Sequence, residues 1–203
     1  MKQTCTHCLE RISEILSMAS RYGNLGEIPT TGASAETGRQ DGQNYSGVIA
    51  SEKLAATDLE RVRKYEGKIR SVSRDTGVDA AIIAAIMSRE SRAGNALDRN
   101  GWGDHGNAFG LMQIDKRWHT PRGAWDSEEH ISQATGILTE KFREIETKFP
   151  SWKASQHMKG AISAYNMGAG NVRNFDTIDE RTTGRDYSND VVARAKFYRQ
   201  QGF

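Results

Sequence analysis

The sequence predicts an α+β domain that is mainly α-helical, with a small antiparallel β-sheet inserted after a central buried helix. Three observations support this fold class. Apolar residues recur at helical spacing over most of the chain after residue 50, and residues 80–87 are apolar without interruption, as expected of a helix surrounded by others. Between Gly94 and Trp125 the helical period disappears and glycines become frequent, which indicates short strands and tight turns.

The first 50 residues divide into two parts. Residues 1–20 form an N-terminal extension that we expect to be disordered or to contain a short amphipathic helix over residues 9–19. Residues 21–50 are rich in Gly, Ser, Thr and Asn and predict an irregular surface segment. We expect this segment to belong to a single domain over residues 21–203.

Two helices are predicted before the sheet. Ser51 is placed to cap the first helix, whose apolar stripe ends near Gly77. Asp79 is placed to cap the second, the central helix over residues 80–91.

Three helices are predicted after the sheet. Asp126 and Glu129 have the spacing of a capping box at the start of a long helix that ends before Pro150. Shorter helices are expected over residues 152–166 and 187–202, where apolar side chains recur at three and four.

Composition excludes several classes of protein. With 36% hydrophobic and 27% charged residues, the chain has no run approaching the roughly 20 apolar residues of a membrane span. A net charge of +2 is far from the dense basic stripe of a nucleic-acid binder. We therefore expect neither a membrane nor a nucleic acid as partner.

The only two cysteines, Cys5 and Cys8, form a C-x-x-C near the start of the sequence. A structural zinc site needs about four ligands, and His7 is the only other candidate nearby. We expect two surface thiols, with no metal and no cofactor. The same segment lacks an unbroken apolar run of about seven residues, so no secretory signal is visible.

Glu90 lies in the last turn of the central helix, separated from the apolar run only by Ser88 and Arg89. Burial and the negative end of the helix dipole should both raise its pKa, and a protonated carboxyl near neutral pH is what a general acid requires. Glycoside hydrolysis pairs such an acid with an ionised carboxylate. A helix-terminal glutamate paired with Arg89 or Arg92 is the alternative reading of this residue alone.

Two candidates for the ionised carboxylate, Asp104 and Asp115, lie in the glycine-rich segment expected to pack against the central helix. Glycine allows a ligand to approach the backbone closely, which suits carboxylates that face a cleft. Taken singly, each is also explained as a turn or strand-end residue.

A third candidate element is "SAYNMGAGNV", where a helix ends in Tyr165 and Asn166. An aromatic ring followed by an amide suits stacking on a sugar and hydrogen bonding to its acetamido group. The remaining aromatic or imidazole candidates for a sugar groove are Trp102, Trp118, His119, Trp125 and Tyr187.

The segments "SRES", "GWGDHGNAFGLMQIDKR", "ISAYNMGAGNV" and "DYSNDVVARAKFY" together resemble the goose-type lysozymes, from about Tyr22 to the C-terminus. The resemblance implies a lysozyme-like fold. It also implies antibacterial hydrolysis of the β-1,4 bond between N-acetylmuramic acid and N-acetylglucosamine in peptidoglycan.

By motif position, the resemblance implies that Glu90 is the general acid and that Asp104 and Asp115 position and activate water. Goose-type lysozymes invert the anomeric carbon, which needs room for a water between acid and base. The positions that would line the sugar cleft are Gln113, Ile114, His119, Tyr165, Asn166 and Tyr187.

The expected partners are peptidoglycan and N-acetylglucosamine oligosaccharides, bound by a monomer. The substrate implies extracellular action, yet without a visible signal a cytoplasmic location or a non-classical route stays open. Two other functions also stay open. A lytic transglycosylase would give 1,6-anhydromuramyl products, and a non-catalytic module would only bind peptidoglycan or chitin.

The sequence departs from the resemblance in its cysteines. Bird members have two disulfides, and Arg21, Ala35, Ser46 and Gly77 stand where their four cysteines would be. Each disulfide contributes about 2–4 kcal/mol, so we expect a lower melting temperature than that of a disulfide-bearing relative under matched conditions.

Overall fold

The structure is a computed structural model that describes residues 21–42 and 44–203. The helix predicted over residues 9–19 and the Cys5–Cys8 pair lie outside the described residues. The elements, in chain order, are α2 (Ala35–Gly38), α3 (Val48–Arg63), α4 (Glu66–Thr76), α5 (Ala80–Ser91), β1 (Trp102–Gly103), β2 (Ala108–Phe109), β3 (Ile114–Asp115), α6 (Glu128–Lys148), α7 (Ala154–Met167) and α8 (Tyr187–Gln200). The predicted fold class, mainly helical with a small antiparallel sheet, is confirmed.

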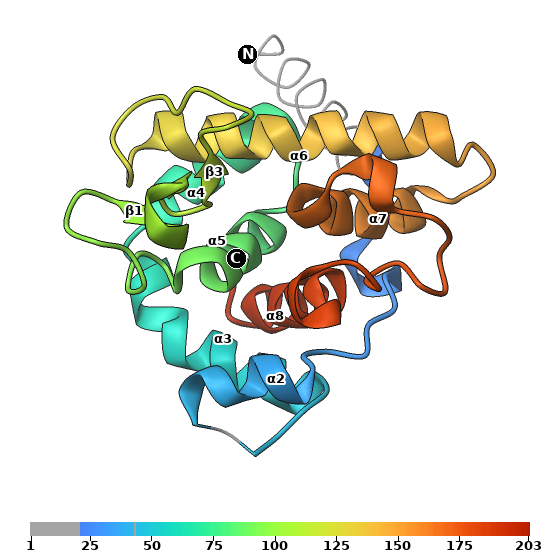
Figure 1. Cartoon of the computed structure of the whole chain (residues 1–203), viewed down its shortest axis with the longest axis horizontal. Helices are drawn as coiled ribbons and strands as arrows, with labels where there is room; N and C mark the ends of the chain where they lie inside the picture. The colour runs from blue at the N-terminus through green and yellow to red at the C-terminus, as the bar shows by residue number, and fades with distance from the viewer. Residues whose placement is uncertain (1–20, 43) are drawn as a thin grey trace, which may run out of the picture.

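The helix α5 is the centre of the fold, as its apolar run predicts. Figure 1 shows it in the middle of the molecule, with α8 on one side and the sheet on the other. Every side chain from Ala81 to Met87 is at most 3% exposed, and α5 contacts α3, α4 and α8. Asp79 caps the helix as predicted, because its carboxylate accepts a hydrogen bond from the Ala81 N–H at 2.9 Å.

The sheet has three two-residue strands in the order β1-β2-β3, all antiparallel. Gly103 pairs with Ala108, and Ala108 pairs with Asp115. Neighbouring strands lie about 4.8 Å apart, so Gly103 and Asp115 are separated by roughly 10 Å across the sheet. The sheet thus brings Asp115 and the residue that follows Gly103 to the same end.

The helix predicted from Ser51 to Gly77 is two helices, α3 and α4, that break at Lys64 and Tyr65. The break contains neither proline nor glycine, and it lets α3 pack against α8 while α4 packs against α6. The predicted end at Gly77 is confirmed, with φ at 74°. The prediction that Ser51 caps the first helix is wrong, because α3 begins three residues earlier.

Ser51 instead holds the N-terminal segment in place. Its hydroxyl is buried inside α3 and accepts a hydrogen bond from the Ala33 N–H at 2.9 Å. The segment expected to be irregular includes the short helix α2, and Leu25 and Ile28 are at most 2% exposed. Its apolar side chains therefore contribute to the core rather than lying on the surface.

Two other helix starts are shifted slightly from their predicted positions. The N-cap of α6 is Ser127, whose hydroxyl accepts from the His130 N–H at 3.2 Å, so the predicted cap at Asp126 is wrong by one residue. The helix α7 begins at Ala154. The predicted end before Pro150 and the predicted start of α8 at Tyr187 are confirmed.

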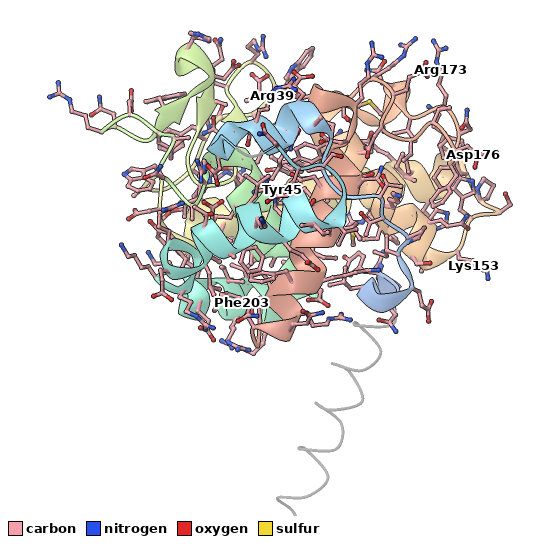
Figure 2. The ribbon with its side chains drawn as sticks, turned by 90° about the horizontal axis from the view of Figure 1, so that it is seen from below. Arg39, Tyr45, Lys153, Arg173, Asp176 and Phe203 are labelled. Atoms are coloured by element: carbon pink, nitrogen blue, oxygen red, sulfur yellow. The ribbon has the colours of Figure 1, made fainter. Side chains whose placement is uncertain are left out.

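Both ends of α3 carry an aromatic residue from another part of the chain. Figure 2 shows Tyr45 over this helix and Phe203, the last residue, at the same side of the molecule. The Lys53 ammonium lies 3.7 Å from the centre of the Tyr45 ring, and Arg63 covers Phe203.

Within residues 21–42 and 44–203, none of the helices combines the length and apolar character needed to cross a bilayer.

Candidate active site

A groove with a cavity volume of about 530 Å³ lies between the sheet and the helices α6 and α7. The structure places six of the nine predicted site residues in its lining: Gln113, Ile114, Asp115, His119, Tyr165 and Asn166. A second cavity of about 660 Å³, bordered by the N-terminal segment and by α4, α7 and α8, contains none of the nine. The other three predicted residues, Glu90, Asp104 and Tyr187, are not among the residues that line the first groove.

Glu90 lies in the last turn of α5, and a side chain of α8 holds its carboxyl group. The Tyr187 hydroxyl donates a hydrogen bond to Glu90 Oε1. Burial raises the pKa of Glu90 to about 7, while the Tyr187 hydrogen bond and the charge of Arg89 act in the opposite direction. The sequence argument for a protonated carboxyl is thus supported by the burial of this residue.

The alternative reading of Glu90, a pairing with a neighbouring arginine, is not what the structure contains. Arg89 directs its guanidinium to Asp190 at 2.8 Å and to Asp186 at 3.0 Å. Arg92 instead forms ion pairs with Asp41 and Asp58. Both arginines are therefore committed to aspartates, and neither neutralises Glu90 by direct contact.

The Arg89 ion pairs belong to a buried cluster of charges behind the site. Burial by itself would lower the pKa of Arg89, but Asp190 and Asp186 raise it above its ordinary value. Asp190 also accepts from Arg194 at 3.0 Å, and Asp186 accepts from the Ser34 N–H at 2.5 Å. This cluster fixes the direction of the Arg89 charge beside the acid.

Asp115 lies at the end of β3 and lines the groove. Arg117 donates to both of its carboxylate oxygens, at distances of 2.5 to 3.0 Å. The side-chain hydrogen bond from Arg117 lowers the pKa of Asp115, and the charge of His119 lowers it further, while slight burial acts against them. Asp115 is therefore ionised at neutral pH.

Asp104 follows β1 in a strained turn. Its φ is 45°, and His105 and Gly106 after it have φ values of 55° and 83°, a left-handed run that costs free energy in residues other than glycine. Its side chain is 58% exposed and does not line the groove. Its charge nevertheless raises the pKa of Arg117, so both aspartates act on the same guanidinium.

Tyr165 and Asn166 at the end of α7 line the groove, but each is also tied to backbone. The Tyr165 hydroxyl donates to the Met112 carbonyl at 2.8 Å. Asn166 Oδ1 accepts from the Thr183 N–H at 3.0 Å. Burial, and to a lesser extent the charge of Glu90, raise the pKa of Tyr165 well above 10.0.

The remaining predicted residues have distinct surroundings. Tyr187 is 1% exposed, so its structural role is as a partner of Glu90 rather than as part of the groove lining. Gln113 has a φ of 52° and donates to the Gly110 carbonyl at 2.9 Å. Ile114 is 2% exposed and borders the groove from β3.

The three tryptophan candidates differ in their surroundings. Trp118 is 80% exposed at the groove, where a flat ring is free to meet a sugar. Trp102 packs on Phe109 with ring centres 4.8 Å apart. Trp125 packs closely over Gly101, where an added Cβ would lie 2.2 Å from the Trp125 Cβ, so it has a structural role.

Sequence reasoning missed Arg117 and the partners of Arg89. A signal for Arg117 exists in the sequence, because Asp115 accepts from the Arg117 N–H at 2.9 Å, the short-range turn that an aspartate favours two residues ahead. No local signal identifies Asp186 and Asp190 as partners of Arg89. Their positions depend on how α8 packs against α5.

Comparison with known proteins decides the family. The model of the family "Lysozyme g" matches residues 22–202. The chain belongs to the lysozyme g family.

Curated relatives agree with this membership over almost their full lengths. The chain is 54% identical to lysozyme g of Epinephelus coioides, with 90% of this chain and 99% of the relative covered. It is 52% identical to lysozyme g of Casuarius casuarius, covering 90% of this chain and 98% of the relative. Identity to lysozyme g of Gallus gallus is 50%, over 90% of this chain and 86% of the relative.

Membership of the lysozyme g family confirms the predicted resemblance and the predicted enzyme class, an antibacterial glycosidase that hydrolyses bacterial peptidoglycan. The comparisons do not favour a lytic transglycosylase or a non-catalytic binding module. Within the part of the chain that the structure describes, no group of three or more His, Cys, Asp or Glu side chains is placed to hold a metal ion.

Proposed function

We propose that this member of the lysozyme g family cleaves the β-1,4 bond between N-acetylmuramic acid and N-acetylglucosamine with inversion. Glu90 is the general acid, Asp115 is the general base, and Asp104 helps to orient the water. The observation that carries this assignment is the contrast in pKa. Burial raises the pKa of Glu90 to about 7, whereas Arg117 lowers the pKa of Asp115.

In this mechanism the proton of Glu90 passes to the glycosidic oxygen as the bond to the anomeric carbon breaks. Water attacks that carbon from the opposite face, and its proton passes to Asp115. Inverting enzymes separate their two carboxyl groups by about 6.5–9.5 Å to admit the water. Glu90 on α5 and Asp115 on β3 come from separate elements rather than from one helix, which is compatible with such a separation.

Sugar binding is assigned to the groove that contains Asp115. Trp118 offers an exposed ring, and His119 and Asn166 offer polar groups along the same lining. Oligosaccharides of N-acetylglucosamine should occupy this groove. We expect the enzyme to act as a monomer, and light scattering at assay concentration tests this expectation.

The stereochemistry of the first product tests the mechanism. Proton NMR during hydrolysis should show the α-anomer of the new reducing end first, and Asp115→Asn should reduce kcat by roughly 10²-fold or more. Asp104→Asn should reduce kcat less. A β-anomer as first product would overturn inversion. Mass spectra with 1,6-anhydromuramyl ends would overturn hydrolysis itself.

A further inference from the structure

The turn Gly110–Gln113 connects β2 to β3, and side chains from separate helices hold its backbone. The Ser91 hydroxyl, at the end of α5, donates to the Leu111 carbonyl at 2.7 Å. The Tyr165 hydroxyl, at the end of α7, donates to the Met112 carbonyl at 2.8 Å. The first anchor is the residue that follows Glu90, and the second lines the groove.

A third anchor is His130 of α6. The Met112 N–H donates to His130 Nε2 at 3.1 Å, and the imidazole is fully buried. Its ring lies directly under Gly110, where an added Cβ would meet His130 Cε1 at 2.3 Å. The ring of Phe109 meets it edge-on, with centres 5.9 Å apart. His130 therefore contacts the turn through a hydrogen bond and through close packing.

The hydrogen bond requires a neutral imidazole. Because Nε2 accepts from Met112, the ring proton belongs on Nδ1. Burial lowers the pKa of His130 to about 4, while the carboxylate of Asp126, just ahead of α6, acts in the opposite direction. At neutral pH the acceptor is present, and protonation would place an N–H against the Met112 N–H.

The turn depends on such anchors because its own backbone is strained. Gly110 has a φ of 78° and Gln113 a φ of 52°, and the second value is unfavourable for a residue with a side chain. The strand β3 follows at once and ends with Asp115. A shift of this turn would therefore move Asp115 relative to the helix that carries Glu90.

We propose that His130 is a positioning residue, which holds the turn between β2 and β3 so that Asp115 keeps its place relative to Glu90. The proposal rests on the role of Asp115 in the proposed function. His130 does not touch the groove, because it is absent from the residues that line it. It acts through the Met112 backbone.

Two substitutions of His130 separate positioning from simple loss of packing. His130→Leu removes the acceptor, whereas His130→Gln keeps an acceptor at about the position of Nε2. Since a displacement of about 1 Å can cost up to roughly 10²-fold in rate, His130→Leu should lower kcat by about 10- to 100-fold with little change in KM. His130→Gln should recover most of the lost kcat.

His157 provides the matched control. It is also a buried histidine, 6% exposed, and its Nε2 donates to the Phe149 carbonyl at 2.8 Å. Its ring packs edge-on against Phe142, but it does not contact the turn. His157→Leu should leave kcat close to that of the unmodified enzyme. An equal loss of kcat in His157→Leu and His130→Leu would overturn the proposal.

A measurement on the unmodified enzyme covers the case in which His130→Leu fails to fold. Amide exchange followed by NMR should show that the Met112 amide loses protection as His130 is protonated, ahead of global unfolding. Persistent protection of Met112 after His130 protonates would overturn the proposal.

The two proposals can fail separately. Full activity in Asp115→Asn, together with a loss of kcat in His130→Leu and its recovery in His130→Gln, would refute the role of Asp115 but retain an anchored turn. Inactive Asp115→Asn together with unchanged kcat in His130→Leu would refute the positioning role alone.

Discussion

The two proposed catalytic carboxylates lie in opposite surroundings, one in the last turn of a long helix and the other at the end of a two-residue strand. Glu90 is half-buried at the end of α5 and receives a hydrogen bond from Tyr187. The Asp115 side chain is 28% exposed and pairs with Arg117, which is itself 60% exposed. The first region is built from long helices and the second from two-residue strands with left-handed turns.

Two carboxyl groups, Glu90 and Asp115, thus obtain different protonation states within one site because their surroundings differ. Burial disfavours the charged form of Glu90, whereas hydrogen bonds from a cation favour the charged form of Asp115. Long helices are suited to the first task because they exclude water. Short strands are suited to the second because they leave the carboxylate accessible to water and substrate.

The largest expected effect comes from removing the acid at the end of α5. Glu90→Gln keeps the shape and the burial of the side chain but cannot donate the same proton, so kcat should fall by roughly 10³- to 10⁴-fold. Clearing of bacterial suspensions measures it, with circular dichroism to confirm folding. Retention of more than a tenth of the activity would show that Glu90 is not the acid.

A smaller effect should follow when Arg89 loses one of its partners. Asp186→Asn removes a negative charge 3.0 Å from the Arg89 guanidinium, so more of the positive charge acts on Glu90. The pKa of Glu90 should fall below about 7, and the alkaline limb of the activity profile should move to lower pH.

Asp176→Asn is the control for Asp186→Asn, because it removes the same charge from an exposed position that Figure 2 places at the surface. Its pH profile should match that of the unmodified enzyme. Equal profiles for all three proteins would contradict a role for the Arg89 ion pairs in setting the acid.

Tyr187→Phe should move the alkaline limb of the activity profile to higher pH, which is the opposite of the shift expected for Asp186→Asn. The Tyr187 hydroxyl stabilises the ionised form of Glu90 and so lowers its pKa. Without it the pKa should rise above about 7, and activity should persist to higher pH although kcat declines through looser positioning. The pH dependence of kcat/KM measures the shift, and a downward movement would mean that another group sets this limb.

The smallest effect is expected beside Asp115. Arg117→Gln removes the hydrogen bonds that lower the pKa of Asp115. The midpoint of the acid limb of the activity profile should therefore rise toward 3.8, the ordinary pKa of an aspartate. Arg117 is exposed and screened by salt, so added salt should move the acid limb of the unmodified enzyme in the same direction. An acid limb that neither change moves would show that Arg117 does not set the pKa of the base.

Local patterns were enough to predict most of the fold. The apolar run over residues 80–87 predicted the central helix, and Gly77 and Asp79 predicted how neighbouring helices end and begin. The break at Lys64 and Tyr65 could not be predicted, because the apolar stripe runs through it. Its cause is tertiary, since α3 and α4 pack against different helices.

The candidate site divides in the same way. The position of Glu90 in the last turn of the apolar helix predicted its raised pKa, because the packing around that helix removes water from the carboxyl group. The hydroxyl of Tyr187 and the carboxylates that hold Arg89 were out of reach of local patterns, since they lie about 100 positions along the chain. Only the packing of α8 on α5 brings them to the acid.

The packing of α8 on α5 also determines at which stage of folding the site around Glu90 is completed. Protein synthesis produces α5 well before α8, and the N-terminal part of a chain generally folds first. Until α8 docks, Glu90 lacks the hydroxyl of Tyr187, and Arg89 lacks Asp186 and Asp190. Burial is what raises the pKa of Glu90, and α8 packs on α5, so the surroundings of the acid are complete only after the last helix has docked.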